Sequence, residues 1–273
     1  MTGSFLDSTI VIHVSDPSNQ QKAKSESCVA NNQPSQTPYY ALRELLAGHF
    51  QNLCDAHNAI SAAENLGEAG LHLSIKYALS GRKFGSKLQV LLETLATIYK
   101  QNTTGARDQM KQEALTELAL RINRLWRKAH NIGNVELVQS LACFNDGKIE
   151  YGAAGELRAP NNSFNCIPNQ RCAAAAYLFD NKDDLKKMIE ALHPDNLDSQ
   201  AKNKQENVSR RKALKELESK GSKDFDKGRC RALGDAYFAA MCPAGKLVMT
   251  SNSRDFIPLC NALGKKCIST INI

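Results

Sequence analysis

The sequence predicts an α/β fold in which a parallel β-sheet is flanked by helices, with a large, mainly helical segment in the middle of the chain. Three observations support this fold class. Strand-like and helix-like segments alternate near both ends, the middle carries long stretches with a helical period, and no internal repeat is visible. Such alternation is typical of a parallel sheet, because each connection between parallel strands crosses over through a helix.

The first element is predicted to be a buried strand. Residues 4–14 are rich in Ile, Val and Thr and contain one carboxylate, Asp7; a short run of this kind is typical of a strand buried on both faces. Residues 17–38 are polar, so we expect a loop there, with at most a short helix. From Tyr39 onward, a helix is predicted because apolar residues recur at positions 42, 45, 46, 50 and 53.

The middle and the C-terminal part of the chain are assigned from the same patterns. Two helices are expected in residues 71–100 and 106–131, and the short apolar runs around residues 145–147 indicate a β-hairpin. Apolar periodicity and helix-breaking residues then predict the remaining elements. These are helices at 173–178, 183–192, 208–220, 233–241 and 256–263, and strands at 247–250 and 267–273.

The composition excludes several classes of protein. With 42% hydrophobic and 23% charged residues, the chain has ordinary globular usage, unlike a disordered or fibrous protein. No apolar run approaches the roughly 20 residues of a membrane helix, and we expect no secretory signal because the start lacks a basic and then an apolar region. The nine cysteines form no C-x-x-C pair, which favours reduced thiols in a cytoplasmic protein.

The basic excess is concentrated in one stretch of the chain. The net charge is +7, and residues 201–231 alone hold 11 Lys or Arg against 5 Asp or Glu. A basic stretch attracts polyanions, which favours contact with nucleic acid. The alternative is a solvated helix of mixed charge, since Lys212, Glu216 and Lys220 follow one another at i,i+4 spacing.

Four carboxylates occupy positions that together indicate a shared site. Asp7 lies in the apolar N-terminal run, Glu44 on the next helix, Asp235 at the head of a helix, and Asp255 between a strand and a helix. Each has a simpler interpretation alone, because the aspartates could cap helices or turns and Glu44 could face solvent beside Arg43. Together they are expected at one edge of a parallel sheet. Without a lysine partner they would need a cation, and oxygen ligands favour Mg²⁺ or Mn²⁺.

Other catalytic patterns are missing from the sequence. The six histidines show neither H-E-x-x-H nor H-x₃-H spacing, and there is no Gly-rich phosphate loop of the G-x-x-x-x-G-K kind. No nucleophile elbow accompanies a Ser-His-Asp set. Hydrolase chemistry other than the metal-dependent kind is therefore without support.

The segments around these acids resemble motifs of the PIN-domain ribonucleases. The matching segments are Phe5-Leu-Asp-Ser-Thr-Ile-Val-Ile, Ala41-Leu-Arg-Glu-Leu-Leu, Ala232-Leu-Gly-Asp-Ala-Tyr-Phe-Ala-Ala and Leu247-Val-Met-Thr-Ser-Asn-Ser-Arg-Asp-Phe. A typical member is about half as long as this chain, and position 9, where the family often has Asn, is Thr9. The resemblance implies a PIN-like nuclease core in residues 1–54 and 224–273. Residues 55–223 would be a mainly helical insertion packed on or extending that core.

The resemblance also implies an activity, that of a metal-dependent endoribonuclease which hydrolyses RNA phosphodiester bonds. Asp7, Glu44, Asp235 and Asp255 would be catalytic and would hold Mg²⁺ or Mn²⁺, and Asp55 or Glu64 is the alternative to Glu44. The residues expected to bind substrate or to orient metal-bound water are Ser8, Thr250, Asn252, Arg229, Arg231 and Arg254. For the arginines the alternative is pairing with Asp224, Asp226 or Asp255.

The expected partners follow from the same resemblance. RNA, single-stranded or structured, is the substrate; an antitoxin protein is a candidate partner because small PIN nucleases often act as toxins, and a second copy of the chain is another. No contact with a membrane is expected. Two interpretations compete with the enzyme: a non-catalytic PIN-like scaffold that binds nucleic acid or a protein, and a helical interaction module whose terminal strands only close the fold.

Overall fold

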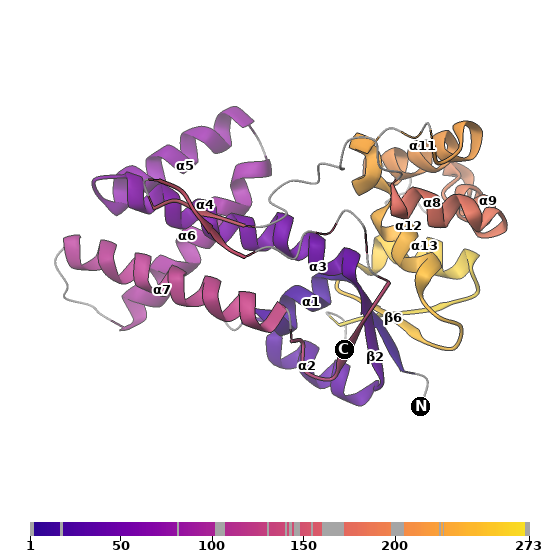
Figure 1. Cartoon of the computed structure of the whole chain (residues 1–273), viewed down its shortest axis with the longest axis horizontal. Helices are drawn as coiled ribbons and strands as arrows, with labels where there is room; N and C mark the ends of the chain where they lie inside the picture. The colour runs from indigo at the N-terminus through magenta and orange to yellow at the C-terminus, as the bar shows by residue number, and fades with distance from the viewer. Residues whose placement is uncertain are drawn as a thin grey trace.

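The computed structural model describes residues 3–16, 19–80, 82–101, 107–129, 131–139, 141, 144, 148–153, 155–159, 172–197, 205–223, 225 and 227–270. In this part of the chain a five-stranded, all-parallel sheet has the order β3-β2-β1-β6-β7 and is flanked by helices (Figure 1). The α/β class predicted from the sequence is confirmed. The strands are β1 (Ser4–Leu6), β2 (Ser35–Pro38), β3 (Val135–Val138), β6 (Leu247–Thr250) and β7 (Lys266–Ser269).

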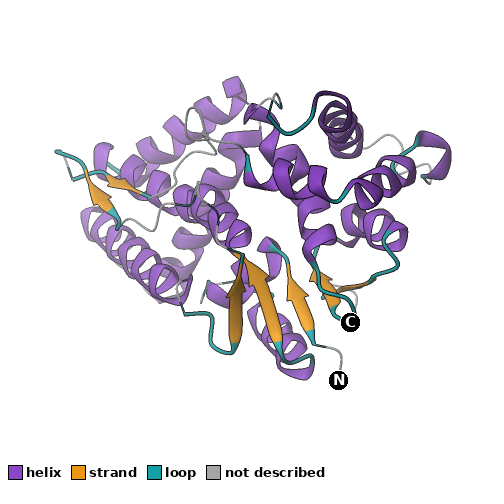
Figure 2. Cartoon of the chain, turned by 45° about the vertical axis from the view of Figure 1, so that its right-hand side comes forward, coloured by secondary structure: helices purple, strands orange, loops and turns teal. Residues whose placement is uncertain are grey.

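The order of the strands places a crevice between β1 and β6. From the central strand β1 the chain builds outward to β2 and β3 on one side, while β6 pairs with the other side of β1 and is followed by β7. Ser4 of β1 aligns with both Ser35 of β2 and Leu247 of β6. Figure 2 shows the strands with their carboxyl ends at one edge of the sheet. Ligands bind at such an edge where the strand order reverses, because connections leave it in opposite directions.

Helices form two groups on either side of this crevice, one from the middle of the chain and one from its C-terminal half (Figure 1). The first group consists of α4 (Gln51–Ala62), α5 (Leu66–Ser80), α6 (Arg82–Gln101) and α7 (Arg107–Ala129). The second consists of α8 (Ala173–Asp180), α9 (Lys182–Ala191), η2 (Pro194–Asn196), α11 (Gln205–Lys220), η3 (Lys227–Leu233), α12 (Gly234–Met241) and α13 (Ser253–Ala262). Next to the sheet lie α1 (Ser8–Ser15), α2 (Lys22–Asn31), α3 (Tyr39–Leu45) and the π-helical turn η1 (Leu46–Phe50).

The first predicted element is wrong beyond its third residue. β1 ends at Leu6, and the Ile- and Val-rich continuation forms helix α1 instead of a strand. Asp7 starts this helix as its N-cap, since its carboxylate accepts the backbone N–H groups of Thr9 and Ile10. Burial of Ile10 and Val11 on α1 outweighs the preference of β-branched residues for strands.

The loop predicted over residues 17–38 is wrong, because this stretch contains helix α2 and strand β2 of the main sheet.

Several other elements differ from the prediction in their limits. The helix that starts at Tyr39 changes to a π-helical turn after Leu45 and resumes as α4. The predicted helix 71–100 is the pair α5 and α6. The turn of the predicted hairpin, residues 145–147, lies outside the described residues. A short antiparallel pair forms nearby between β4 (Glu150–Tyr151) and β5 (Leu157–Arg158).

Residues 135–138, which lie within the expected insertion, form the edge strand β3 of the main sheet and pair with β2. The division of the chain at 54/55 and 223/224 stays a prediction. The seven cysteines in the described ranges are free thiols. Within those ranges, none of the helices combines the length and the apolar character that crossing a bilayer requires.

Candidate active site

Asp7 lies at the carboxyl end of β1, in the crevice beside β6. Its Oδ1 accepts the N–H of Thr9 at 2.8 Å, the hydroxyl of Thr9 at 2.7 Å and the N–H of Ile10 at 3.1 Å. Its Oδ2 accepts the hydroxyl of Thr250, the last residue of β6, at 2.5 Å. Asp7 is 2% exposed, and this burial raises its pKa to about 6 even though the hydrogen bonds lower it. The carboxylate thus joins the two central strands where they end.

Glu44 comes from α3, which follows β2 directly, and it is partly buried beside the same crevice. Burial raises the pKa of Glu44 to about 8, against the effect of a hydrogen bond from Ser8. The charges of Asp235 and Asp7 raise it further, and Asp235 also raises the pKa of Asp7. Three carboxylates that are far apart in the sequence therefore lie close enough to repel one another.

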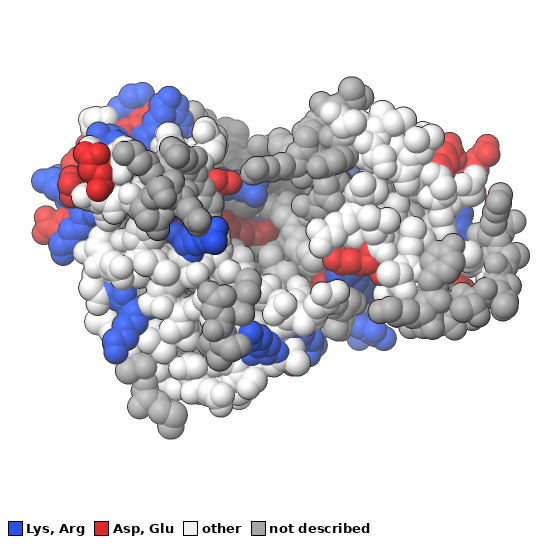
Figure 3. All heavy atoms as spheres, turned by 180° about the vertical axis from the view of Figure 1, so that it is seen from behind, with Lys and Arg blue, Asp and Glu red and all other residues white. Residues whose placement is uncertain are grey.

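A cavity of about 680 Å³ opens above these carboxylates. We call it the acid cavity and define it by its charged lining residues, which are Glu44, Glu206, Asp235, Asp255, Arg210, Arg229 and Arg231. Seen from behind, the molecule is hollowed between the two groups of helices, and acidic and basic side chains lie side by side there (Figure 3). Asp7 does not line the cavity, because its carboxylate is enclosed beneath it by Thr250 and Thr9.

Asp235 has a basic partner, an arginine, although the sequence analysis considered only the lack of a lysine. The side chain of Arg210 on α11 forms an ion pair with the Asp235 carboxylate and donates to Asn207 Oδ1 at 2.7 Å. Arg210 is 5% exposed, and its buried Nε has no hydrogen-bond partner among the described residues. This arginine belongs to the site, whereas its place in the basic stretch suggested a surface contact with nucleic acid.

Asp255 lies in the first turn of α13 and is buried. It accepts a hydrogen bond from the side-chain amide of Asn252, the N-cap residue of that helix, whose own N–H donates to the hydroxyl of Thr250 at 2.8 Å. The simpler interpretation of Asp235 and Asp255 as helix caps is wrong, because Leu233 and Asn252 are the cap residues. For Asp7 that interpretation is correct, and it coexists with its place in the cluster.

The remaining predicted substrate contacts divide into two sets. Ser8, Arg229 and Arg231 line the acid cavity. Arg229 pairs with Glu216 on α11, and neither Asp224 nor Asp226 lies within the described residues. Arg254 is exposed and is not among the lining residues of the cavity.

The two alternatives to Glu44 lie elsewhere in the fold. Asp55, on α4, accepts the side-chain amide of Gln51 at 2.7 Å and forms an ion pair with Lys87 of α6. Glu64 is exposed at the end of α4. Neither residue lines the acid cavity, whereas Glu44 does.

The donor atoms of the site suit a hard cation in type but not in their present grouping. Carboxylate and hydroxyl oxygens are the ligands that Mg²⁺ and Mn²⁺ prefer, and Glu44, Asp235, Asp255 and Ser8 all line the same cavity. Among the described residues, however, no three His, Cys, Asp or Glu side chains are grouped so that they could hold a metal ion. The guanidinium of Arg210 is the positive group beside Asp235. A bound cation would require Arg210 to release this carboxylate.

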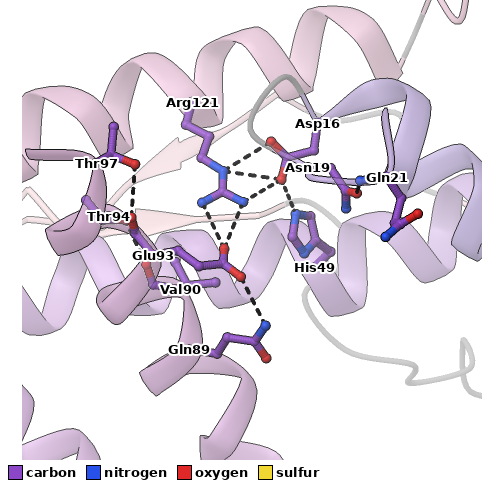
Figure 4. A network of polar contacts seen from close by, with 10 residues as sticks. All are labelled: Asp16, Asn19, Gln21, His49, Gln89, Val90, Glu93, Thr94, Thr97 and Arg121. Carbon is purple, nitrogen blue, oxygen red and sulfur yellow. Dashed lines mark hydrogen bonds and ion pairs between the residues drawn. The ribbon is translucent and has the colours of Figure 1, made fainter. Parts of the chain in front are cut away.

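A second polar cluster, which the sequence analysis did not predict, lies beside the acid cavity (Figure 4). Asp16, the C-cap residue of α1, is fully buried and accepts Arg121 Nε at 3.1 Å, Arg121 Nη2 at 2.7 Å and His49 Nε2 at 2.6 Å. Burial alone would raise the pKa of Asp16, but the hydrogen bonds from His49 and Arg121 hold it well below the usual range. Arg121 also contacts Glu93 Oε2 at 3.4 Å. Asp16 therefore stays ionised inside the protein.

Comparisons with known proteins add no relative. No protein-family model, no curated protein and no solved structure matches this chain. The function is therefore argued from the site alone.

Proposed function

We propose that this protein is a metal-dependent endoribonuclease with a PIN-like core, which hydrolyses RNA phosphodiester bonds at the acid cavity. The observation that carries the proposal is the meeting of Asp7, Glu44 and Asp235 at the carboxyl edge of the parallel sheet, where burial raises the pKa values of Asp7 and Glu44 and the neighbouring carboxylates raise them further. Carboxylates that repel one another in this way are stabilised by a divalent cation.

The position of the site supports the PIN-like interpretation. The strand β1 lies at the centre of the sheet, and the acids follow β1 or lie on α3, α12 and α13, which surround the crevice between β1 and β6. These elements all belong to residues 1–54 and 224–273, the stretches that the resemblance covers.

Within the site the side chains take different roles. Glu44, Asp235 and Asp255 face the cavity and would hold Mg²⁺ or Mn²⁺, while Asp7 acts from beneath through its hydrogen bond to Thr250. When bound, the cation would lower the pKa of an attacking water and would place positive charge beside the phosphoryl group. Ser8 donates to Glu44 and keeps its carboxylate oriented toward the cavity.

The arginines of the cavity wall give the site its affinity for phosphate. Arg231 and Arg229 come from η3, at the mouth of the acid cavity, and a guanidinium matches phosphate oxygens through paired N–H donors. Arg210 has a second task, because its ion pair neutralises Asp235 when no other cation is bound. Its release from Asp235 makes a positive side chain available to the phosphate.

Cleavage of RNA by charge-neutral variants tests the proposal. We expect the wild-type protein to cut a 5′-labelled single-stranded RNA in Mn²⁺, and Glu44→Gln and Asp235→Asn to cut at least about 100-fold more slowly, as loss of a group that stabilises transition-state charge does. Glu64→Gln is the matched control and should cut like the wild type, because Glu64 lies outside the cavity. Circular dichroism shows whether each variant is folded. Equal rates for all the folded proteins would refute the assignment.

The second candidate function is a PIN-like scaffold without catalysis, and one observation favours it: Arg210 already neutralises Asp235. A calorimetric Mn²⁺ titration separates the two, since the enzyme requires a saturable site that Asp235→Asn weakens. A scaffold would show no saturable heat. An antitoxin protein and a second copy of the chain stay proposed partners, and light scattering at several concentrations tests the latter.

A further inference from the structure

A second cavity, of about 740 Å³, lies next to the acid cavity and is lined by side-chain amides. We call it the amide cavity, after its five amide residues Asn19, Gln20, Gln21, Asn52 and Gln89. They come from the start of α2 and from α4 and α6, which are separate parts of the chain. An amide side chain carries both a hydrogen-bond donor and an acceptor, so this lining can recognise a polar ligand that offers both.

Three of these amides have no hydrogen-bond partner for their side chains among the described residues, namely Gln20, Gln21 and Asn52. The other two are engaged, since the Gln89 amide donates to Glu93 at 3.0 Å and Asn19 Oδ1 accepts the backbone N–H of Gln21 at 2.8 Å. Within the described part of the chain, three amides therefore line the cavity without a protein partner.

The charges of the wall show which kind of ligand fits. Arg121 is the cation of the amide cavity's described lining, and its guanidinium is shared between Asp16 and Glu93 (Figure 4). Two carboxylates thus face one arginine, and an anion such as phosphate meets no available positive charge. A neutral, polar and planar group suits the cavity better, and a nucleobase is such a group.

The two cavities adjoin at one place. Ile12, Gly48 and His49 line both of them, and a Cβ added to Gly48 would meet nothing within 4 Å. The ring of His49 is held there by its 2.6 Å hydrogen bond to Asp16. Thr9, whose hydroxyl donates to Asp7, also lines the amide cavity. The base next to a phosphate held in the acid cavity therefore has a second cavity directly beside it.

We propose that the amide cavity is a nucleobase subsite, which binds the base next to the phosphate held in the acid cavity and gives the protein a preference for sequence. This inference rests on the proposed function for the position of the phosphate. Binding of the base depends on the amides alone. Asn and Gln side chains match adenine through its N6 donor and N7 acceptor, so adenine is the expected base.

Binding without metal tests the subsite. Fluorescence anisotropy in EDTA measures the affinity of the full chain for labelled eight-nucleotide RNAs of each single base. We expect the wild type to bind oligoadenylate at least about 5-fold more tightly than the others, which is the low end of the discrimination that one bidentate amide contact gives. Asn52→Leu should reduce this ratio to below about 2-fold.

Asn123→Leu is the matched control, because Asn123 is exposed on α7 and lies outside both cavities. It should keep the wild-type ratio. A preference for another base that Asn52→Leu removes would support the subsite with a different occupant. No binding, no base preference in the wild type, or a preference that Asn52→Leu leaves intact would each overturn the proposal.

A second pair of variants tests the connection between the cavities. Gly48→Leu fills the junction, whereas Gly48→Ala adds only a Cβ for which there is room. Oligoadenylate should bind Gly48→Leu at least about 10-fold more weakly than Gly48→Ala, and equal affinities would refute the connection. If the protein shows the base preference but cuts no RNA, the proposed nuclease activity is refuted and the nucleobase subsite is supported. If the protein cuts RNA without a base preference, the nuclease activity is supported and the subsite is refuted.

Discussion

Replacing Glu44 by glutamine should stabilise the protein at high pH and leave its stability at low pH almost unchanged. The pKa of Glu44 is raised from 4.5 to about 8 in the folded protein. The folded state therefore keeps a proton that the unfolded chain releases above pH 4.5. By linkage, the free energy of unfolding falls as the pH rises from about 4.5 to about 8, and Glu44→Gln removes this loss because glutamine does not ionise.

The size of the effect follows from the same shift. At about 1.4 kcal/mol per pKa unit, the shift from 4.5 to about 8 gives an upper limit of about 5 kcal/mol. Glu44 is only partly buried and lines a cavity, so solvent screens part of this energy. We expect Glu44→Gln to be more stable than the wild type by on the order of 2 kcal/mol at pH 9 in EDTA.

Urea denaturation of both proteins at pH 5 and pH 9 provides the measurement. Other groups titrate in both proteins, so the difference between them isolates Glu44. Glu64→Gln removes an exposed carboxylate and should show no such pH-dependent gain. A stability difference between Glu44→Gln and the wild type that is the same at both pH values would refute the raised pKa of Glu44. Mn²⁺ at pH 9 should raise the stability of the wild type more than that of Glu44→Gln.

Three further changes follow from the two polar clusters. Arg121→Met leaves the buried Asp16 without its main partner, so the free energy of unfolding, measured by urea denaturation, should fall by about 3–5 kcal/mol. A loss below about 1 kcal/mol would contradict the pairing. Arg210→Met removes the guanidinium that competes for Asp235, so calorimetry should find roughly 10-fold tighter binding of Mn²⁺, and weaker binding would mean that Arg210 assists the cation. Thr250→Val deletes the hydroxyl that donates to Asp7, so the carboxyl resonance of Asp7 should titrate above pH 6, and an unchanged midpoint would show that this hydrogen bond does not lower the pKa of Asp7.

A parallel sheet could be predicted from the sequence because its C-terminal strands and helices are short, alternate and are bounded by clear breaks. β2 was missed because residues 35–38 end a polar stretch that is typical of a loop. The N-terminal run misled the prediction for a physical reason. A stretch of Ile, Val and Thr favours a strand by local preference. The helix forms because Asp7 caps its N-terminus and because Ile10, Val11 and Val14, which follow, are buried in the helical conformation. β3 was missed for the opposite reason, because residues 135–138 are partly exposed at the edge of the sheet.

Asp7, Asp235 and Asp255 could be expected at one edge of the sheet because each lies at a strand end or in the first turn of a helix, whereas Glu44 lies near the end of α3. The pairing of Arg210 with Asp235 could not be predicted, since the charge pattern does not reveal which of the three consecutive basic residues 210–212 points inward. One signal was present. Arg210 is spaced at i+3, i+4 and i+7 from Ala213, Leu214 and Leu217, and all four residues are buried on α11.

The same reasoning applies to the other cluster and connects the two cavities. Arg121 lies three residues after Leu118 and four before Leu125, within the buried stripe of α7. A charged side chain at such a position is costly unless a carboxylate meets it, so an arginine inside an apolar helical stripe predicts a buried acid elsewhere in the chain. For Arg121 that acid is Asp16, 105 residues away, and for Arg210 it is Asp235. Arg210 holds Asp235 at the wall of the acid cavity, and Arg121, which lines the amide cavity, holds the fully buried Asp16. An arginine within an apolar helical stripe is thus the signal in the sequence that marks a wall of each cavity.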